Sequence, residues 1–210
     1  RIHSGFYRAV LSLWDPITSI LREWTSEHQL KIYVTGHSKG GALASIAAVL
    51  LQYDPMLPNA TYVSTVGSAK FGDSTFRDFY NKNIDQSTFE NHLDLVPFLP
   101  ISKSTMEVMD DEMLEMVEGM VVGSCNKRNG TWDYQAVGKR KYIDPNGIVV
   151  EEVTKELDSK RIRDFEKRTL LSATNFLSAH SARCQENPKT VGYFSTLASD
   201  VCAWHQSMIP

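Results

Sequence analysis

The sequence has 210 residues, of which 42% are hydrophobic and 22% charged, and its formal net charge is −3. This is an ordinary globular composition, and the length fits a single domain, residues 1–210, with a sizeable core. A slightly acidic chain with a sequence pI of 6.1 gives no reason to expect nucleic acid as a partner. No apolar run approaches the roughly 20 residues of a transmembrane helix, so we expect no membrane span.

The predicted elements alternate between helix and strand over the first 91 residues. Apolar residues at helical spacing predict a first helix, and Pro16 is a place where this helix could bend or divide. The elements that follow alternate in the same way, as expected for a mostly parallel sheet flanked by helices, an α/β fold. In chain order they are a helix over 5–28, a strand over 30–35, a helix to about Tyr53, a strand over 61–67, a helix over 74–80 and the end of a strand over 89–91.

The middle of the chain is less regular. Residues 106–120 carry five methionines at helical spacing, which predicts an amphipathic helix. Methionine is flexible and polarisable, so one hypothesis is an acyl-binding cover in which Met113 and Met116 contact substrate. The alternative is a helix that simply lies over the core. Three short strands and a charged helix are predicted beyond it, at 132–137, 140–143, 148–150 and 153–177, with a hairpin turn at Asp144-Pro145-Asn146-Gly147.

The cysteines give a weak indication of compartment. Cys125, Cys184 and Cys202 show no metal-ligand spacing, and we expect neither a metal nor another cofactor. Cys184 and Cys202 are the preferred pair for a disulfide, because both fall in the C-terminal loop region, but the sequence leaves this bridge open. Asn59 and Asn129 fit the glycosylation pattern. These features favour a secreted protein without establishing one, and the oligomeric state stays open.

The most informative motif is Gly36-His37-Ser38-Lys39-Gly40. A β-branched run precedes it and a helix of small residues follows, which is the context of a nucleophile elbow. The Ser38 hydroxyl would project above the sheet, and the Lys39 amide would face the oxyanion. We expect glycine at Gly36 and Gly40 because a Cβ there would clash where strand and helix cross. The alternative is an ordinary turn in which Ser38 caps the helix.

An activated serine needs a base and an orienting acid, which follow it in the order acid then base in hydrolases of this motif. Asp94 comes just after a predicted strand among apolar neighbours and is the preferred acid, while Asp73 and Asp85 lie on more polar loops. The base must follow Asp94, which leaves His180 and His205. His180 is preferred because His205 lies near the end of the chain.

His37 precedes the serine, so its side chain should point away from the Ser38 hydroxyl. We assign His37 to substrate binding, together with Met113 and Met116.

Several motifs occur in a defined order: residues 3–6 before the first helix, residues 34–44 around Ser38, residues 67–73, residues 91–100, and His180-Ser181 with Gly192-Tyr193 downstream. In this order they resemble the motifs of the class 3, fungal-type lipase family. The resemblance implies an α/β-hydrolase fold. It also implies a carboxylic-ester hydrolase acting on triacylglycerol or other lipid esters, in solution or at a membrane or droplet surface.

Carried over by motif, the resemblance implies Ser38 as nucleophile, Asp94 as orienting acid and His180 as general base, acting through an acyl-enzyme. The backbone amide of Lys39 would supply half of the oxyanion hole. An acyltransferase or a thioesterase would use the same acyl-enzyme. A catalytically inactive lipase-like module that binds lipid or a protein is the alternative outside the enzymes.

The sequence also departs from the family pattern. Lys39 stands where fungal members usually have leucine, and Ala69 stands in place of a proline. The interval from Asp94 to His180 is longer than in the compact fungal enzymes, which makes room for the Met-rich helix. Family members place a strand, a second oxyanion donor and the lid before the segment that corresponds to residues 3–6. We therefore expect this chain to be a fragment of a longer enzyme, with its N-terminal strands missing.

Overall fold

The structure, a computed structural model, describes residues 1–111, 115, 133–169, 179–180 and 193. Five strands form one sheet in the order β1-β2-β3-β4-β5. The first four are parallel to their neighbours and β5 is antiparallel to β4, so the predicted mostly parallel sheet is confirmed. The strands are β1 (Ile32–His37), β2 (Ala60–Val66), β3 (Gln86–Asn91), β4 (Lys139–Ile143) and β5 (Val149–Val150).

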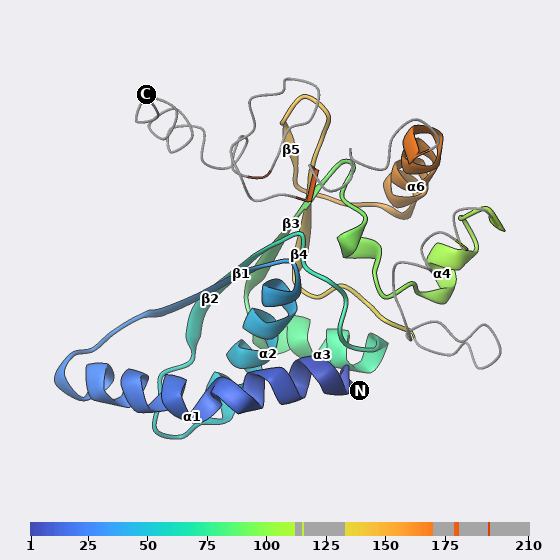
Figure 1. Cartoon of the computed structure of the whole chain (residues 1–210). Helices are drawn as coiled ribbons and strands as arrows, with labels where there is room; N and C mark the ends of the chain where they lie inside the picture. The colour runs from blue at the N-terminus through green and yellow to red at the C-terminus, as the bar shows by residue number, and fades with distance from the viewer. Residues whose placement is uncertain (112–114, 116–132, 170–178, 181–192, 194–210) are drawn as a thin grey trace, which may run out of the picture.

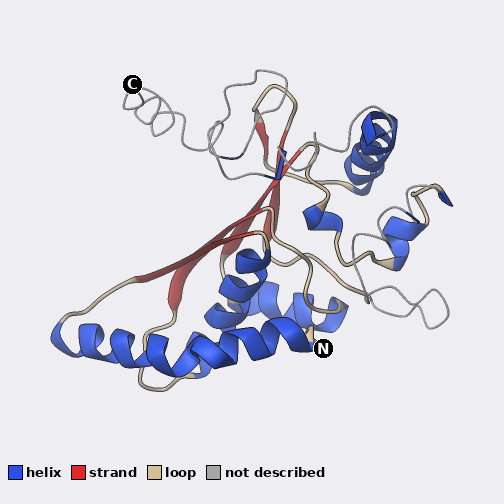
Figure 2. Cartoon of the chain, in the orientation of Figure 1, coloured by secondary structure: helices blue, strands red, loops and turns tan. Residues whose placement is uncertain are grey.

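The described helices fall into two groups. The first group lies below the sheet in Figure 1, whereas α4 and α6 lie beyond the carboxyl ends of the strands; Figure 2 shows the same arrangement by element type. The first group is α1 (Ser4–Glu27), α2 (Lys39–Tyr53) and α3 (Ser74–Asn83). The second comprises the 3₁₀ turn η1 (Val96–Phe98), α4 (Lys103–Met106) and α6 (Lys155–Thr169).

The main core lies between the sheet and α1, α2 and α3. Small side chains on α2 let this helix approach the strands closely, and Ala42 and Val63 are fully buried there. α1 is one continuous helix through Pro16. The side chains of the main core are Val10, Ala42, Ile46, Ala48, Val63, Phe71, Tyr80, Ile84 and Val137.

A second apolar cluster joins the segment after β3 to α6. Its buried members are Leu95, Phe98, Ile101, Met109, Ile162 and Phe165.

The helix expected over 106–120 differs from the observed structure at its start. α4 ends at Met106 and residues 107–110 are not helical, whereas Asp111 and Glu115 are, so the expectation that the helix begins at 106 is wrong. Asp110 and Asp111 favour a helix start over a helix interior. The remainder of 106–120, apart from residue 115, lies outside the described residues.

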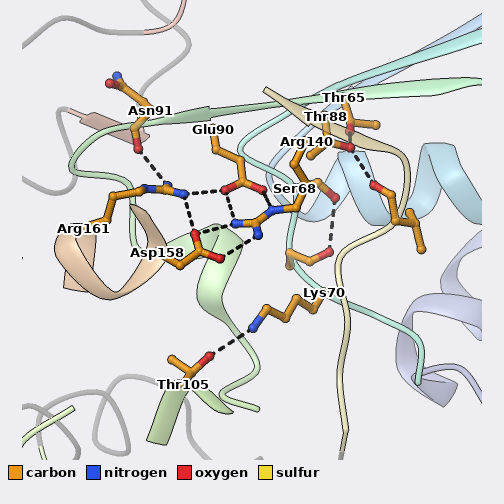
Figure 3. Close-up of polar contacts among 12 residues, drawn as sticks. Thr65, Ser68, Lys70, Thr88, Glu90, Asn91, Thr105, Arg140, Asp158 and Arg161 are labelled. Carbon is orange, nitrogen blue, oxygen red and sulfur yellow. Dashed lines mark hydrogen bonds and ion pairs between the residues drawn. The ribbon is translucent and has the colours of Figure 1, made fainter. Parts of the chain in front are cut away.

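A buried ionic cluster fixes α6 to the sheet (Figure 3). The fully buried Glu90 on β3 accepts hydrogen bonds from Arg140 Nε at 2.6 Å and from Arg161 Nη1 at 2.7 Å. Asp158 on α6 accepts two more from Arg140, at 2.7 and 2.8 Å. Arg161 Nη2 also donates to the Asn91 carbonyl oxygen at 3.2 Å. Each charge therefore has opposite charges beside it, and the cluster reaches the end of β3.

In the C-terminal half, the predicted hairpin is present and one of the predicted strands is not. The hairpin is confirmed: Asp144 Oδ1 accepts from the amides of Asn146 and Ile148, and Gly147 has φ 82°. The strand expected over 132–137 is wrong for its described residues, where Gln135 makes a single bridge to Gly72. This segment runs alongside the loop before α3, and its backbone bridge is to Gly72 and not to a strand of the sheet. α6 covers only part of 153–177, and residues 170–177 lie outside the described residues.

Candidate active site

The nucleophile candidate sits on a sharp turn between β1 and α2. Ser38 has φ 60° and ψ −130°, and it is the only residue other than glycine with a positive φ in the described part of the chain. Its amide donates to the Val66 carbonyl at 3.0 Å, and its carbonyl accepts from the Gly41 amide at 2.9 Å. Its side chain makes no capping hydrogen bond to α2. The interpretation of Ser38 as an ordinary helix cap is therefore wrong.

The glycines of the elbow have unequal roles. A Cβ at Gly36 would lie 2.1 Å from the Gly40 carbonyl oxygen, so the expected need for glycine there is confirmed. A Cβ at Gly40 would meet nothing within 4 Å, so the expected clash at that position is wrong. The close approach lies one residue later, where a Cβ on Gly41 would be 2.7 Å from the Ser68 Cβ. α2 thus presents the Gly41 side, not the Gly40 side, to the loop after β2.

The structure brings Asp94 and His180 together. His180 Nδ1 lies 2.9 Å from Asp94 Oδ2, and Asp94 is almost completely buried. A carboxylate only accepts hydrogen bonds, so Nδ1 carries the proton and Nε2 of a neutral His180 is the basic nitrogen. The Val96 amide donates to the other oxygen, Asp94 Oδ1, at 2.9 Å. Ser38 shares no hydrogen bond with His180 in the described structure.

The rival acids are engaged elsewhere. Asp73 caps α3 by accepting from the Phe76 amide at 2.9 Å. Asp85 forms an exposed ion pair with Lys139 at 3.0 Å. The rival base, His205, lies outside the described residues. Among the described candidates, the Asp94 and His180 side chains are therefore the ones that meet.

Tyr193 is a further partner of Asp94, although its sequence context indicates only that it belongs to the Gly192-Tyr193 motif. Its buried hydroxyl donates to Asp94 Oδ2 at 2.6 Å and accepts from the Asn91 amide at 2.8 Å. Burial, reinforced by the Asp94 charge, raises the pKa of Tyr193 well above its usual value. The hydroxyl therefore stays a neutral donor and satisfies an oxygen that burial would otherwise leave poorly solvated.

The other predicted site residues have different surroundings. His37 Nε2 lies 2.6 Å from the His180 carbonyl oxygen, and the two imidazole rings are 4.6 Å apart between centroids. Lys39 is the first residue of α2, where backbone amides have no intrahelical acceptor, and its side chain is exposed. Met113 and Met116 lie outside the described residues.

Gly67 places backbone directly against the Asp94–His180 pair. It has φ 54°, and a Cβ built on it would lie 2.6 Å from Asp94 Oδ2 and 3.2 Å from His180 Cε1. We expect Gly67→Ala to lower catalytic turnover by about 100-fold, because any side chain must displace the acid or the base. Turnover and thermal unfolding of the purified variant test this expectation.

The control for Gly67→Ala is Gly147→Ala in the β4–β5 turn. Gly147 has a comparable φ of 82°, so alanine there has a similar backbone cost, about 1 kcal/mol. The control should lose stability and keep its turnover. Equal turnover in the two variants would contradict the steric argument at Gly67.

Lys70 joins the stretch after β2 to α4 (Figure 3). Its Nζ donates to Ser102 Oγ and to Thr105 Oγ1, each at 3.3 Å, and its amide donates to the Leu99 carbonyl at 2.7 Å. Burial, together with the charge of Arg140, lowers the pKa of Lys70 to about 8. Nothing in its sequence context distinguished Lys70 from an exposed lysine, because its partners come from a segment about thirty residues away.

The described residues offer neither a metal-binding cluster nor a helix that could span a membrane. They contain no group of three or more His, Cys, Asp or Glu side chains that could hold a metal ion. No helix among them combines the length and hydrophobicity that crossing a membrane requires.

Comparison with known proteins shows which sequences this chain is similar to. Residues 1–104 match the family model "Lipase (class 3)". A lipase from Rhizopus niveus is 32% identical over 106 residues, which are 48% of this chain and 26% of that protein. The secreted mono- and diacylglycerol lipase 1 of Fusarium solani is 32% identical over 105 residues, 47% of this chain and 29% of that protein. The chain thus spans between a quarter and a third of the length of these curated relatives.

A solved structure shares the fold. The triacylglyceride lipase of Rhizomucor miehei superposes with a TM-score of 0.56 at 20% identity, covering 76% of this chain and 53% of that one. The sheet with its helices is therefore of the α/β-hydrolase type expected from the sequence. Through residues 1–104, the chain belongs to the class 3 lipase family.

Proposed function

We propose that this protein is a carboxylic-ester hydrolase that acts on lipid esters, with Ser38 as its nucleophile. The observation that carries the proposal is the buried Asp94 carboxylate hydrogen-bonded to His180 Nδ1. That arrangement leaves Nε2 as a base, and the positive φ of Ser38 is the strained backbone of a nucleophile elbow. The names of the relatives from Rhizopus niveus and Fusarium solani support lipid esters as the substrate class.

The chemistry follows from these roles. Ser38 Oγ attacks the ester carbonyl carbon while His180 Nε2 takes the hydroxyl proton, and Asp94 stabilises the resulting imidazolium. The Lys39 amide at the N-terminus of α2 donates to the oxyanion of the tetrahedral intermediate. His180 then gives its proton to the departing alcohol, which leaves an acyl group on Ser38. Water, deprotonated by His180, attacks this acyl-enzyme, and His180 returns the proton to Ser38 Oγ as the carboxylic acid leaves.

Labelling with a fluorophosphonate probe tests whether Ser38 is activated. The full chain is treated with the probe, and the adduct is located by mass spectrometry. We expect close to one adduct per folded molecule, on Ser38, and none after thermal unfolding, because activation requires His180 in place. Ser68, which lies beside the elbow, is the control serine and should stay unlabelled. A folded protein without an adduct on Ser38 would contradict the proposal and favour a non-catalytic binding module.

Product analysis separates hydrolysis from acyl transfer. With a lipid ester in buffer that also contains an alcohol acceptor, a hydrolase should release mainly free fatty acid. A dominant transfer product would make water the minor acceptor and reassign the protein as an acyltransferase.

A further inference from the structure

Two successive backbone carbonyls at the candidate base are held by side chains from two different strands. Asn91 Nδ2, at the end of β3, donates to the Ala179 carbonyl at 3.1 Å. His37 Nε2, at the end of β1, lies 2.6 Å from the His180 carbonyl. A carbonyl oxygen only accepts hydrogen bonds, so His37 must carry its proton on Nε2. These bonds constrain the backbone on which the His180 imidazole is mounted.

We propose that His37 and Asn91 are positioning residues that hold the His180 backbone, so that its imidazole stays aligned between Asp94 and the Ser38 turn. This inference rests on the proposed function, in which His180 is the general base. It replaces the expectation that His37 binds substrate, since the Nε2 of His37 already has a backbone partner.

The His37 hydrogen bond connects the backbone of the candidate base directly to the turn that carries Ser38. His37 directly precedes Ser38 and pairs in register with Val66 on β2, and the Val66 carbonyl accepts the Ser38 amide. One side chain therefore fixes the His180 backbone relative to the residue next to the nucleophile. The imidazole of His37 also packs against that of His180, with planes tilted by 30°.

The Asn91 bond connects the base to the acid. The Asn91 carbonyl accepts from the Asp94 amide at 3.1 Å and from Arg161 Nη2 at 3.2 Å (Figure 3). Its own amide donates to the Tyr193 hydroxyl, which in turn donates to Asp94. Asn91 therefore holds the Ala179 carbonyl through its side chain, while its own backbone is hydrogen-bonded to Asp94 and to Arg161 on α6.

The decisive variants remove or retain the donor at residue 37. His37→Leu keeps apolar bulk but cannot donate, whereas His37→Gln offers an amide N–H of similar reach. With a soluble short-chain ester we expect kcat of His37→Leu to fall about 10- to 100-fold, because a misplaced base loses near-attack geometry. We expect KM to change by less than about threefold, since uniform binding is untouched. His37→Gln should recover most of the loss. His28→Leu, at an exposed histidine after α1, is the matched control.

A second readout does not depend on activity. The His180 Nδ1 proton, hydrogen-bonded to Asp94, should give a strongly downfield proton NMR signal, assigned by its absence in His180→Gln. We expect the signal in wild type and His37→Gln, and its loss or shift in His37→Leu. Asn91→Asp tests the other bond, because it replaces the donor but keeps an acceptor for the His92 amide. If His37→Leu fails to fold, Asn91→Asp decides by the same signal.

The outcomes are distinguishable. An unchanged signal and kcat in both His37→Leu and Asn91→Asp would overturn the inference. A higher KM at unchanged kcat in His37→Leu would also overturn it and return His37 to substrate binding. If the wild type lacks both hydrolysis and labelling of Ser38, the proposed function fails, and the response of the proton signal alone decides whether these residues position His180.

Discussion

Ser38→Ala should lower ester hydrolysis by about 10⁴-fold or more and leave the melting temperature unchanged. The activity falls because only the Oγ atom can form the acyl-enzyme, and removing a triad nucleophile has effects of this size. The fold is spared because Ser38 makes no capping bond to α2, and alanine keeps the same Cβ on the same backbone. Initial rates with a short-chain ester and calorimetric unfolding of both proteins give the two quantities. Activity within about tenfold of wild type would contradict Ser38 as the nucleophile.

Ser38→Gly separates strain from chemistry. At φ 60° and ψ −130° any Cβ is disfavoured, and this backbone strain is of order 1–3 kcal/mol. Glycine relieves the strain, but its greater conformational freedom in the unfolded state offsets part of the gain in stability. We therefore expect Ser38→Gly to be as inactive as Ser38→Ala but to unfold at a temperature at least as high. A clearly lower melting temperature for the glycine variant than for the alanine variant would contradict strain at the elbow.

Glu90→Ala should destabilise the fold by about 3–5 kcal/mol, the largest stability effect we expect from a single substitution here. Removing this fully buried carboxylate leaves the guanidinium groups of Arg140 and Arg161 facing each other, with Asp158 as the remaining anion. Urea unfolding at neutral pH measures the loss. Glu151→Ala is the matched control, since Glu151 pairs with Lys141 on the surface and should change stability by less than about 1 kcal/mol.

The Glu90 effect should depend on pH with a definite sign. Burial by itself raises the pKa of Glu90, but the guanidinium groups of Arg140 and Arg161 outweigh it and lower that pKa to about 2, from a model-peptide value of 4.5. The stabilisation is therefore complete above about pH 5 and is lost as the pH falls from there toward 2. The stability gap between wild type and Glu90→Ala should narrow over that range. A gap that widens toward low pH would contradict a charged Glu90 at neutral pH.

Local sequence patterns were enough to predict the type of sheet, the β4–β5 hairpin and the turn at Ser38. The alternation of helix and strand predicted the mostly parallel sheet, and the Asp144–Gly147 turn predicted the β4–β5 hairpin. The Gly-x-Ser-x-Gly pattern located the strained turn at Ser38 and the necessary glycine at Gly36. These features are decided by residues only a few positions apart, so the sequence carries them directly. Where the pattern was ambiguous, periodicity alone predicted a helix start at residue 106 and a strand over 132–137, which the described residues do not form.

Only the tertiary structure decided which side chains meet. From sequence alone, Asp94 competed with two other aspartates and His180 with one other histidine, and the structure pairs Asp94 with His180. The bond from His37 to the His180 carbonyl, and the contact of Glu90 with Arg161, join residues 143 and 71 positions apart. Such contacts depend on strand order and on where α6 packs. Because topology and not local propensity sets these distances, a short window of sequence contains no signal for them.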